Sequence, residues 1–92
     1  MSENVERSSL DLRYEGHRLR DAAREAQLLA SIAERGIEEP LEGVDTSGGR
    51  YLLNGFKRLR CAKKLGIHGV PYVSLGDEEA AGIVSLMRVA TD

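Results

Sequence analysis

The sequence contains little of what holds together small secreted or metal-bound domains. Its 92 residues include one cysteine, two prolines, three tyrosines, one phenylalanine and no tryptophan. A single cysteine forms no internal disulfide and supplies no zinc cluster, which is typical of a protein from a reducing compartment. No run of about 18 apolar residues predicts a membrane span, and the polar start, MSENVERSS, lacks a signal-peptide core. We therefore expect a cytoplasmic protein.

The length suffices for one small domain, and the hydrophobic pattern predicts an α+β fold. We expect a flexible tail over residues 1–9 and a single domain over residues 10–92. Strands are predicted at Leu10–Tyr14, within a hairpin over Leu41–Leu53, and at Pro71–Ser74. Helices are predicted from an Asp21 cap to Arg35, over Phe56–Leu65, and from an Asp77 cap to about residue 90. About three helices would then pack on a short mixed sheet.

Glycine followed by isoleucine ends the first two predicted helices. Gly36-Ile37 follows Arg35, and Gly66-Ile67 follows Leu65. A left-handed glycine at this position, with an apolar residue packing back, predicts a Schellman-type helix end.

The charges are unevenly distributed. The net charge is −2, so the chain as a whole is no polycation. Between Thr46 and Gly76, however, no residue is acidic, and the basic residues are Arg50, Lys57, Arg58, Arg60, Lys63 and Lys64. A basic centre between acidic flanks indicates either a local anion site or a solvated helix face rich in lysine.

The segment Tyr51–Gly66, YLLNGFKRLRCAKKLG, carries the strongest signal. An apolar strand runs through Asn54-Gly55 into a helix, which leaves free backbone N–H groups at the helix start. Lys57, Arg58 and Arg60 lie in the first turn and a half, where the helix dipole disfavours cations. A bound phosphate is the simplest reason for their presence.

Arg58 and Cys61 both fall on the apolar side of this predicted helix. Leu59, Cys61, Ala62 and Leu65 share one apolar arc at 100° per residue, and Arg58 projects within it. Arg58 is either a structural arginine, paired with a carboxylate or a strand end, or a contact to a ligand phosphate. Cys61 is interpreted as a small buried hydrophobe.

Three stretches together resemble the N-terminal domain of ParB-type proteins, within the ParB/sulfiredoxin fold, over roughly residues 10–89. LASIAERGIEEPL at residues 29–41 resembles the family's LaxSIxexGixqPi. YLLNGFKRLRCAKKLG resembles yelvaGeRRlrAaklaG, and VPYV at residues 70–73 resembles vPaiv. The order and spacing of the three carry the resemblance.

The resemblance implies a phosphate site at the corner of glycine and arginine. ParB proteins use this corner for CTP, and sulfiredoxins and a related serine kinase use it for ATP. Carried over, the contacts would be the Gly55 backbone with Lys57 and Arg58. The cofactor would be CTP or ATP.

The sequence also departs from the family pattern. Phe56 stands where ParB has an acid and sulfiredoxin its reactive cysteine. The ParB Glu-Asn pair that helps hold nucleotide and metal aligns near Met87-Arg88, so ligands for magnesium are missing. We expect no metal site. Within these 92 residues we expect no helix-turn-helix or dimerisation segment of the kind usual in ParB.

The leading hypothesis is a non-catalytic ParB-like domain in a DNA partition or mobile-element context. It would bind nucleotide phosphates or a nucleic-acid backbone through Gly55, Lys57, Arg58 and Arg60, and Lys63 and Lys64 would be further backbone contacts. DNA binding would be weak, salt-dependent and without sequence preference.

Two alternatives stay open. One is an interaction or regulatory subunit that lost the nucleotide and forms a homodimer, or binds another protein, through the helix at residues 77–90. The other is a nucleotide hydrolase, nuclease or kinase, for which Glu15, Asp21 and Glu25 are the candidate acids. Glu25 is notable among them because it falls within the apolar arc of its helix.

Overall fold

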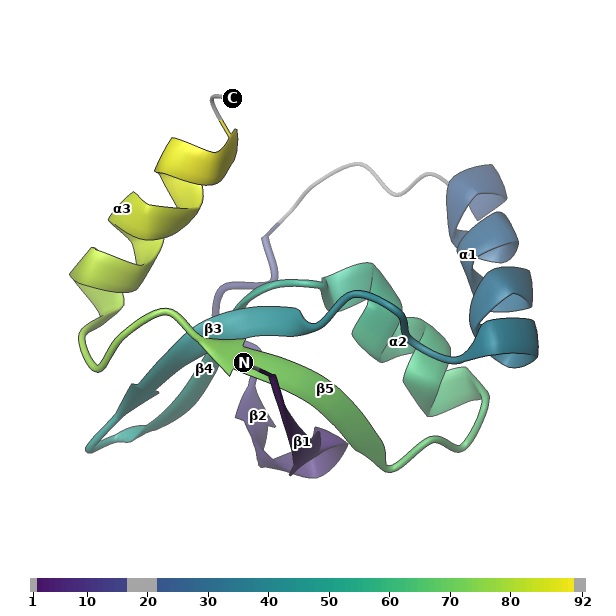
Figure 1. The fold of residues 1–92 in the computed structure, drawn as a ribbon, viewed down its shortest axis with the longest axis horizontal. Coiled ribbons are helices and arrows are strands. Elements are labelled where there is room, and N and C mark those ends of the chain that lie inside the picture. The colour runs from purple at the N-terminus through teal and green to yellow at the C-terminus, as the bar shows by residue number, and fades with distance from the viewer. Residues whose placement is uncertain (1, 17–21, 91–92) are drawn as a thin grey trace.

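Five strands form one mixed sheet at the centre of the protein (Figure 1). The computed structural model describes residues 2–16 and 22–90, and side chains up to Val84. The strands are β1 (Glu3–Glu6), β2 (Leu10–Asp11), β3 (Leu41–Thr46), β4 (Gly49–Asn54) and β5 (Gly69–Ser74). Their order in the sheet is β1-β5-β3-β4-β2. The pairs β1–β5 and β3–β4 are antiparallel, whereas β3–β5 and β2–β4 are parallel.

The two edge strands follow one another along the chain. Only the 3-10 turn η1 (Arg7–Ser9) separates β1 from β2, although they pair with opposite sides of the sheet. The sheet must therefore curl until its edges approach each other. The Arg7 N–H donates to the carbonyl of His68 at 2.7 Å, which fixes this short connection to the residue just before β5.

The start of the chain corrects one prediction. A flexible tail was expected over residues 1–9, but Glu3–Glu6 pairs with β5 and Val5 is buried in the core. Because three of the four β1 residues are polar, this strand lacks the apolar run that predicts burial. The strand predicted at Leu10–Tyr14 is also shorter and ends at Asp11.

Three helices accompany the sheet, as predicted: α1 (Ala22–Arg35), α2 (Phe56–Lys64) and α3 (Glu79–Ala90). α1 and α2 pack against each other, whereas α3 lies apart from them and contacts β3 and β4 (Figure 1). The Asp21 cap predicted for α1 falls outside the described residues. No helix in residues 2–16 or 22–90 is long and apolar enough to cross a membrane.

The glycine helix ends differ in detail. At Gly66 the pattern is a complete Schellman motif, since Ile67 N–H donates to the Ala62 carbonyl and Gly66 N–H donates to that of Lys63. At Gly36 (φ 77°) the N–H donates to the Ile32 carbonyl, which is the bond of the simpler left-handed cap. Both glycines therefore end their helices where the sequence predicted.

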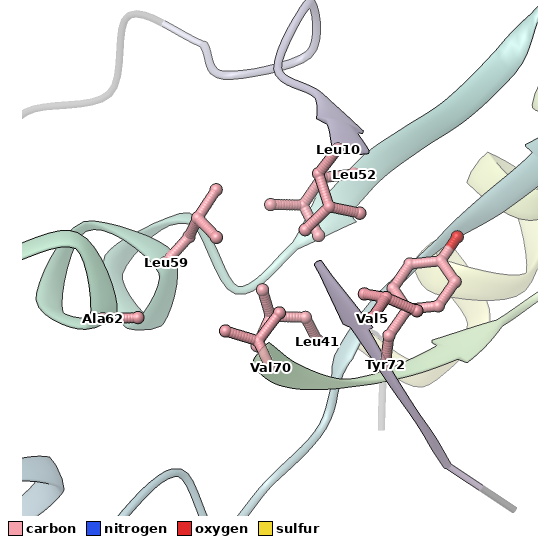
Figure 2. Close-up of a cluster of buried hydrophobic side chains, with 8 residues drawn as sticks. All are labelled: Val5, Leu10, Leu41, Leu52, Leu59, Ala62, Val70 and Tyr72. Atoms are coloured by element: carbon pink, nitrogen blue, oxygen red, sulfur yellow. The ribbon is translucent and has the colours of Figure 1, made fainter. Parts of the chain in front are cut away.

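The core lies between the curled sheet and α2 (Figure 2). Its buried cluster consists of Val5, Leu10, Leu41, Leu52, Leu59, Ala62, Val70 and Tyr72. Burying a leucine or an aromatic residue stabilises the fold by roughly 1.5–3 kcal/mol each. The Tyr72 side chain is fully buried, and its hydroxyl donates to Asp45 at 2.9 Å, so its polar atom is satisfied.

The predicted hairpin is confirmed and depends on a close approach at Gly43. β3 and β4 are joined by Ser47-Gly48, and their register shifts between Glu42 and Gly43. A Cβ atom at Gly43 would collide with the Tyr51 carbonyl oxygen and lie 2.8 Å from the Tyr72 hydroxyl. Backbone cannot move aside as a flexible side chain does.

We predict that Gly43→Ala lowers the free energy of unfolding by more than about 2 kcal/mol, because the added methyl group overpacks the hairpin. Urea denaturation followed by circular dichroism measures the effect. Gly16→Ala is the matched control, since a Cβ there meets nothing within 4 Å, and its change should stay within about 0.5 kcal/mol. Equal stability of the two variants would show that Gly43 is not constrained.

Candidate phosphate-binding corner

The chain turns from β4 into α2 at a single residue, Gly55. This residue has φ 104° and ψ 20°, in the left-handed region, and it is buried. A Cβ atom there would lie 2.8 Å from Leu41 Cγ, so both the conformation and the space call for glycine. The N-terminus of α2 receives no side-chain cap hydrogen bond from Gly55. Its first N–H groups are therefore donors available to an anion.

Two cations stand beside this helix start. Lys57 is exposed, and Arg58 has 22% of its side chain exposed. Arg58 Nη1 donates to the Pro40 carbonyl at 3.0 Å, and Nη2 donates to Glu39 at 3.2 Å. The carbonyl contact is the strand-end pairing considered for an arginine in the apolar arc. Glu39, by contrast, is 80% exposed, so its ion pair with Arg58 is a solvent-screened one.

Arg60 is held in a different environment. Its Nη2 donates to Glu25 at 2.6 Å, and its Nη1 donates to Glu15 at 2.8 Å. The exposed side-chain fractions are 21% for Arg60, 12% for Glu25 and 32% for Glu15. The hydrogen bond with Glu25 is the main cause that raises the pKa of Arg60 above its ordinary value. Two carboxylates thus offset this guanidinium, whereas Arg58 meets one exposed carboxylate.

Two of the three candidate acids of the sequence meet at Arg60 as well. Glu25 was notable because a carboxylate in an apolar arc needs a partner, and the structure supplies Arg60 and, at 3.7 Å, Lys64. Glu15 reaches the same guanidinium from the segment after β2. Asp21, the third candidate, lies outside the described residues. The cluster joins α1, α2 and the β2 side of the sheet by charge-assisted bonds.

The departures from the family pattern have a structural counterpart. Phe56 is partly buried and packs against the core cluster. Cys61 is fully buried, and burial raises the pKa of its thiol, in keeping with a small hydrophobe. Side chains of Met87-Arg88 are not among those described. Across the described residues, no group of three or more His, Cys, Asp or Glu side chains could hold a metal ion.

Sequence reasoning missed the partners of Arg58. Glu39 and Pro40 belong to a stretch that matches the family pattern, yet no role was assigned to either. The available signal was their position, directly before the apolar residue that opens β3. Only the fold brings this position next to the first turn of α2.

We predict that Glu25 and Arg60 are energetically coupled. In a double-mutant cycle of Glu25→Gln and Arg60→Gln, the coupling in the free energy of unfolding should be roughly 1–2 kcal/mol, because both groups are largely removed from solvent. Chemical denaturation of the four proteins gives the value.

The pair Asp11–Arg13 is the control for this cycle. Its nitrogen and oxygen atoms are 3.3 Å apart, but the side chains are 40% and 51% exposed. Its coupling should fall within experimental error. A Glu25–Arg60 coupling no larger than that of this control would contradict a structural role for the cluster.

Comparisons with known proteins find structural neighbours only. No protein-family model matches the chain, and no curated protein sequence matches it. Sulfiredoxin from Arabidopsis thaliana aligns with a TM-score of 0.73 and 20% identity over 80% of this chain and 83% of that one. ParB from Caulobacter crescentus, solved in complex with CTP-gamma-S, aligns with a TM-score of 0.74 and 23% identity.

The ParB match covers 96% of this chain but only 53% of the other, so this chain spans about half of that C-terminally truncated ParB chain. A Pnob8-like ParB-N domain aligns with a TM-score of 0.65 and 22% identity, over 80% of this chain and 29% of that one. The described residues form three helices and a mixed, curled sheet, as predicted for a small α+β domain. The chain therefore has the fold shared by sulfiredoxin and the ParB N-terminal domain.

Proposed function

We propose that this domain binds the phosphate groups of a nucleotide, without catalysis, at the corner formed by Gly55, Lys57 and Arg58. One observation carries the proposal: α2 starts without a side-chain cap at a buried left-handed glycine, next to two cations. Backbone N–H groups and the helix dipole attract an anion there. Arginine adds planar, paired donors that suit a phosphate.

The structural neighbours support a nucleotide as the ligand. The Caulobacter ParB structure contains CTP-gamma-S, and its fold aligns with 96% of this chain. CTP is thus the first candidate and ATP the second. Duplex DNA is the competing ligand, because its backbone carries the same phosphate chemistry and would use Lys63 and Lys64 in addition. A role in DNA partition is part of this proposal and follows from the same neighbours.

Arg60 is not one of the proposed phosphate contacts. Its guanidinium is bonded to Glu15 and Glu25, and a phosphate would have to displace them. The same bonds engage both described candidate acids. An attacking water would need a carboxylate near the phosphate. Phe56, next to Gly55, offers none, and Glu39 is paired with Arg58. These contacts support binding without turnover.

A second candidate function is a protein-interaction module. It is favoured by α3, on which Ile83 and Val84 are 36% and 50% exposed. Exposed apolar residues on one helix are typical of a surface that meets another protein. A dimer that sedimentation experiments detect, and that is lost when Val84 is replaced by a polar residue, would support this candidate over nucleotide binding.

We predict that CTP shifts the amide signals of residues 54–58 in an NMR titration at low salt with magnesium. Lys57→Ala should weaken binding about 3-fold to 10-fold, and Arg58→Ala more than about 10-fold, because each removes a charge-assisted contact. Arg58→Lys keeps the charge and tests whether a loss reflects misfolding. Parallel titrations with ATP and a short DNA duplex identify the ligand.

Lys63→Ala is the matched control, since it removes an exposed lysine from the other end of the same helix. Its affinity for CTP should equal that of the unmodified protein. Unchanged binding in the Lys57→Ala/Arg58→Ala double variant would mean that the site is elsewhere. Binding of DNA alone, with loss in Lys63→Ala, would replace the nucleotide by a nucleic-acid backbone.

Glu39 should compete with the phosphate for Arg58. Because it lies 3.2 Å from Arg58 Nη2 and is 80% exposed, removing its charge frees a donor at little structural cost. We predict that Glu39→Gln tightens CTP binding about 2-fold to 5-fold, the range of an exposed ion pair. Isothermal titration calorimetry measures the change.

Glu38→Gln is the control, because it removes the same charge from the adjacent residue, whose ion pair is with Arg35. An equal gain in both variants would indicate general electrostatics rather than competition at Arg58. A loss of affinity in Glu39→Gln would show that Glu39 orients Arg58 for binding.

A further inference from the structure

A groove of about 760 Å³ lies along the second half of α2. It is bounded by η1, β2, the segment after β2 and α2, and its lining residues are Arg7, Ser8, Leu10, Leu12, Glu15, Leu59, Arg60, Lys63 and Lys64. Lys64 lies nine positions after Gly55 along the helix, a rise of about 13 Å. The groove therefore lies beyond the phosphate corner. Its volume is in the range of small-molecule sites.

Three leucines make the groove apolar at its base. Leu10 on β2 and Leu59 on α2 are nearly buried, at 7% and 6%, and project toward the same part of the core (Figure 2). Leu12 is 40% exposed and lies beside them in the lining. A ligand with an apolar body would mainly cover Leu12, because little of Leu10 and Leu59 is still exposed to water.

Cations from two separate segments face this apolar base. Lys63 and Lys64 are exposed in the last turn of α2, and within the described residues Lys63 has no ion pair. Arg7 comes from η1, and its Nε donates to the Ile67 carbonyl at 3.1 Å, just beyond the end of α2. The helix dipole accounts for two lysines at a helix C-terminus. It attracts the Arg7 guanidinium as well, so the three cations form a basic rim on the groove.

The acid in the lining does not cancel this charge. Glu15 accepts a hydrogen bond from Arg60 Nη1 at 2.8 Å, so the two form a neutral pair at the groove. The Lys64 side chain is 60% exposed, and its Nζ lies 3.7 Å from Glu25 Oε2, which is a long distance for an ion pair. The charges available to a ligand are therefore those of Arg7, Lys63 and Lys64.

We propose that this groove binds an amphipathic organic anion, a carboxylate or phosphate monoester with an aliphatic body. The aliphatic part lies on Leu10, Leu12 and Leu59. The anionic group is held by Lys63, Lys64 and Arg7 at the end of α2. A bare inorganic anion gains nothing from the leucines, and a cationic amphiphile is repelled by the rim, so the two halves together define the ligand class.

The test uses decanoate and decyl phosphate below their micelle concentrations, with NMR amide shifts of the full chain as the readout. We expect shifts at residues 7–12 and 59–64, with affinity lowered more than about 10-fold in Lys63→Glu and about 5-fold in Leu12→Asn. Tighter binding of one probe assigns the headgroup. Arg35→Glu reverses the charge of an exposed cation on α1, outside both the phosphate corner and this lining, and should leave both affinities unchanged.

Several results would overturn the proposal. They are equal binding of decyltrimethylammonium, equal binding of inorganic phosphate, and affinities that Lys63→Glu leaves unchanged. Shifts with an acidic peptide but with neither decyl anion would assign the groove to a protein partner instead. Because the CTP site depends on Lys57 and this groove on Lys63, failure of either proposal leaves the other measurable.

Discussion

The close packing of Gly55 against Leu41 determines how α2 leaves the sheet. Gly55 turns the chain from strand β4 into helix α2 within one residue, in a left-handed conformation. A Cβ atom at this position would lie 2.8 Å from Leu41 Cγ. Leu41 is fully buried and is the first residue of β3, the strand that pairs with β4. This packing sets the direction of α2, and thereby the positions of Arg58, Leu59 and Arg60.

The direction of α2 assigns different surroundings to cations that are neighbours in sequence. Lys57 is left in solvent, Arg58 reaches back to the Pro40 carbonyl, and Arg60 reaches forward to Glu15 and Glu25. A helix rotates 100° per residue, so adjacent side chains face different partners. The basic centre of the sequence is thus divided among an open corner, a strand end and an internal ion cluster. The groove at the end of the helix adds a fourth environment.

The closure of the sheet depends on contacts between residues far apart in the sequence, and local hydrophobic periodicity does not predict such contacts. β1 is mostly polar, and one buried residue, Val5, commits it to the core. Its pairing with β5 joins residues more than 60 positions apart, and the Arg7–His68 bond completes the connection. Periodicity therefore predicted the hairpin and the helices but took residues 1–9 for a tail. The same closure brings Arg7 to the end of α2.

Patterns along the chain were enough to predict the α+β class, the three helices, the glycine ends of the first two, the hairpin, and the glycine that starts α2. These features rest on local rules: hydrophobic period, left-handed conformation and turn chemistry. The partner of each charged side chain, by contrast, could not be predicted before the fold was known. Glu15, Glu25 and Arg60 come from three separate segments, and so do Arg7 and Lys63, because partners of charged side chains are set by packing between elements rather than by spacing along the chain.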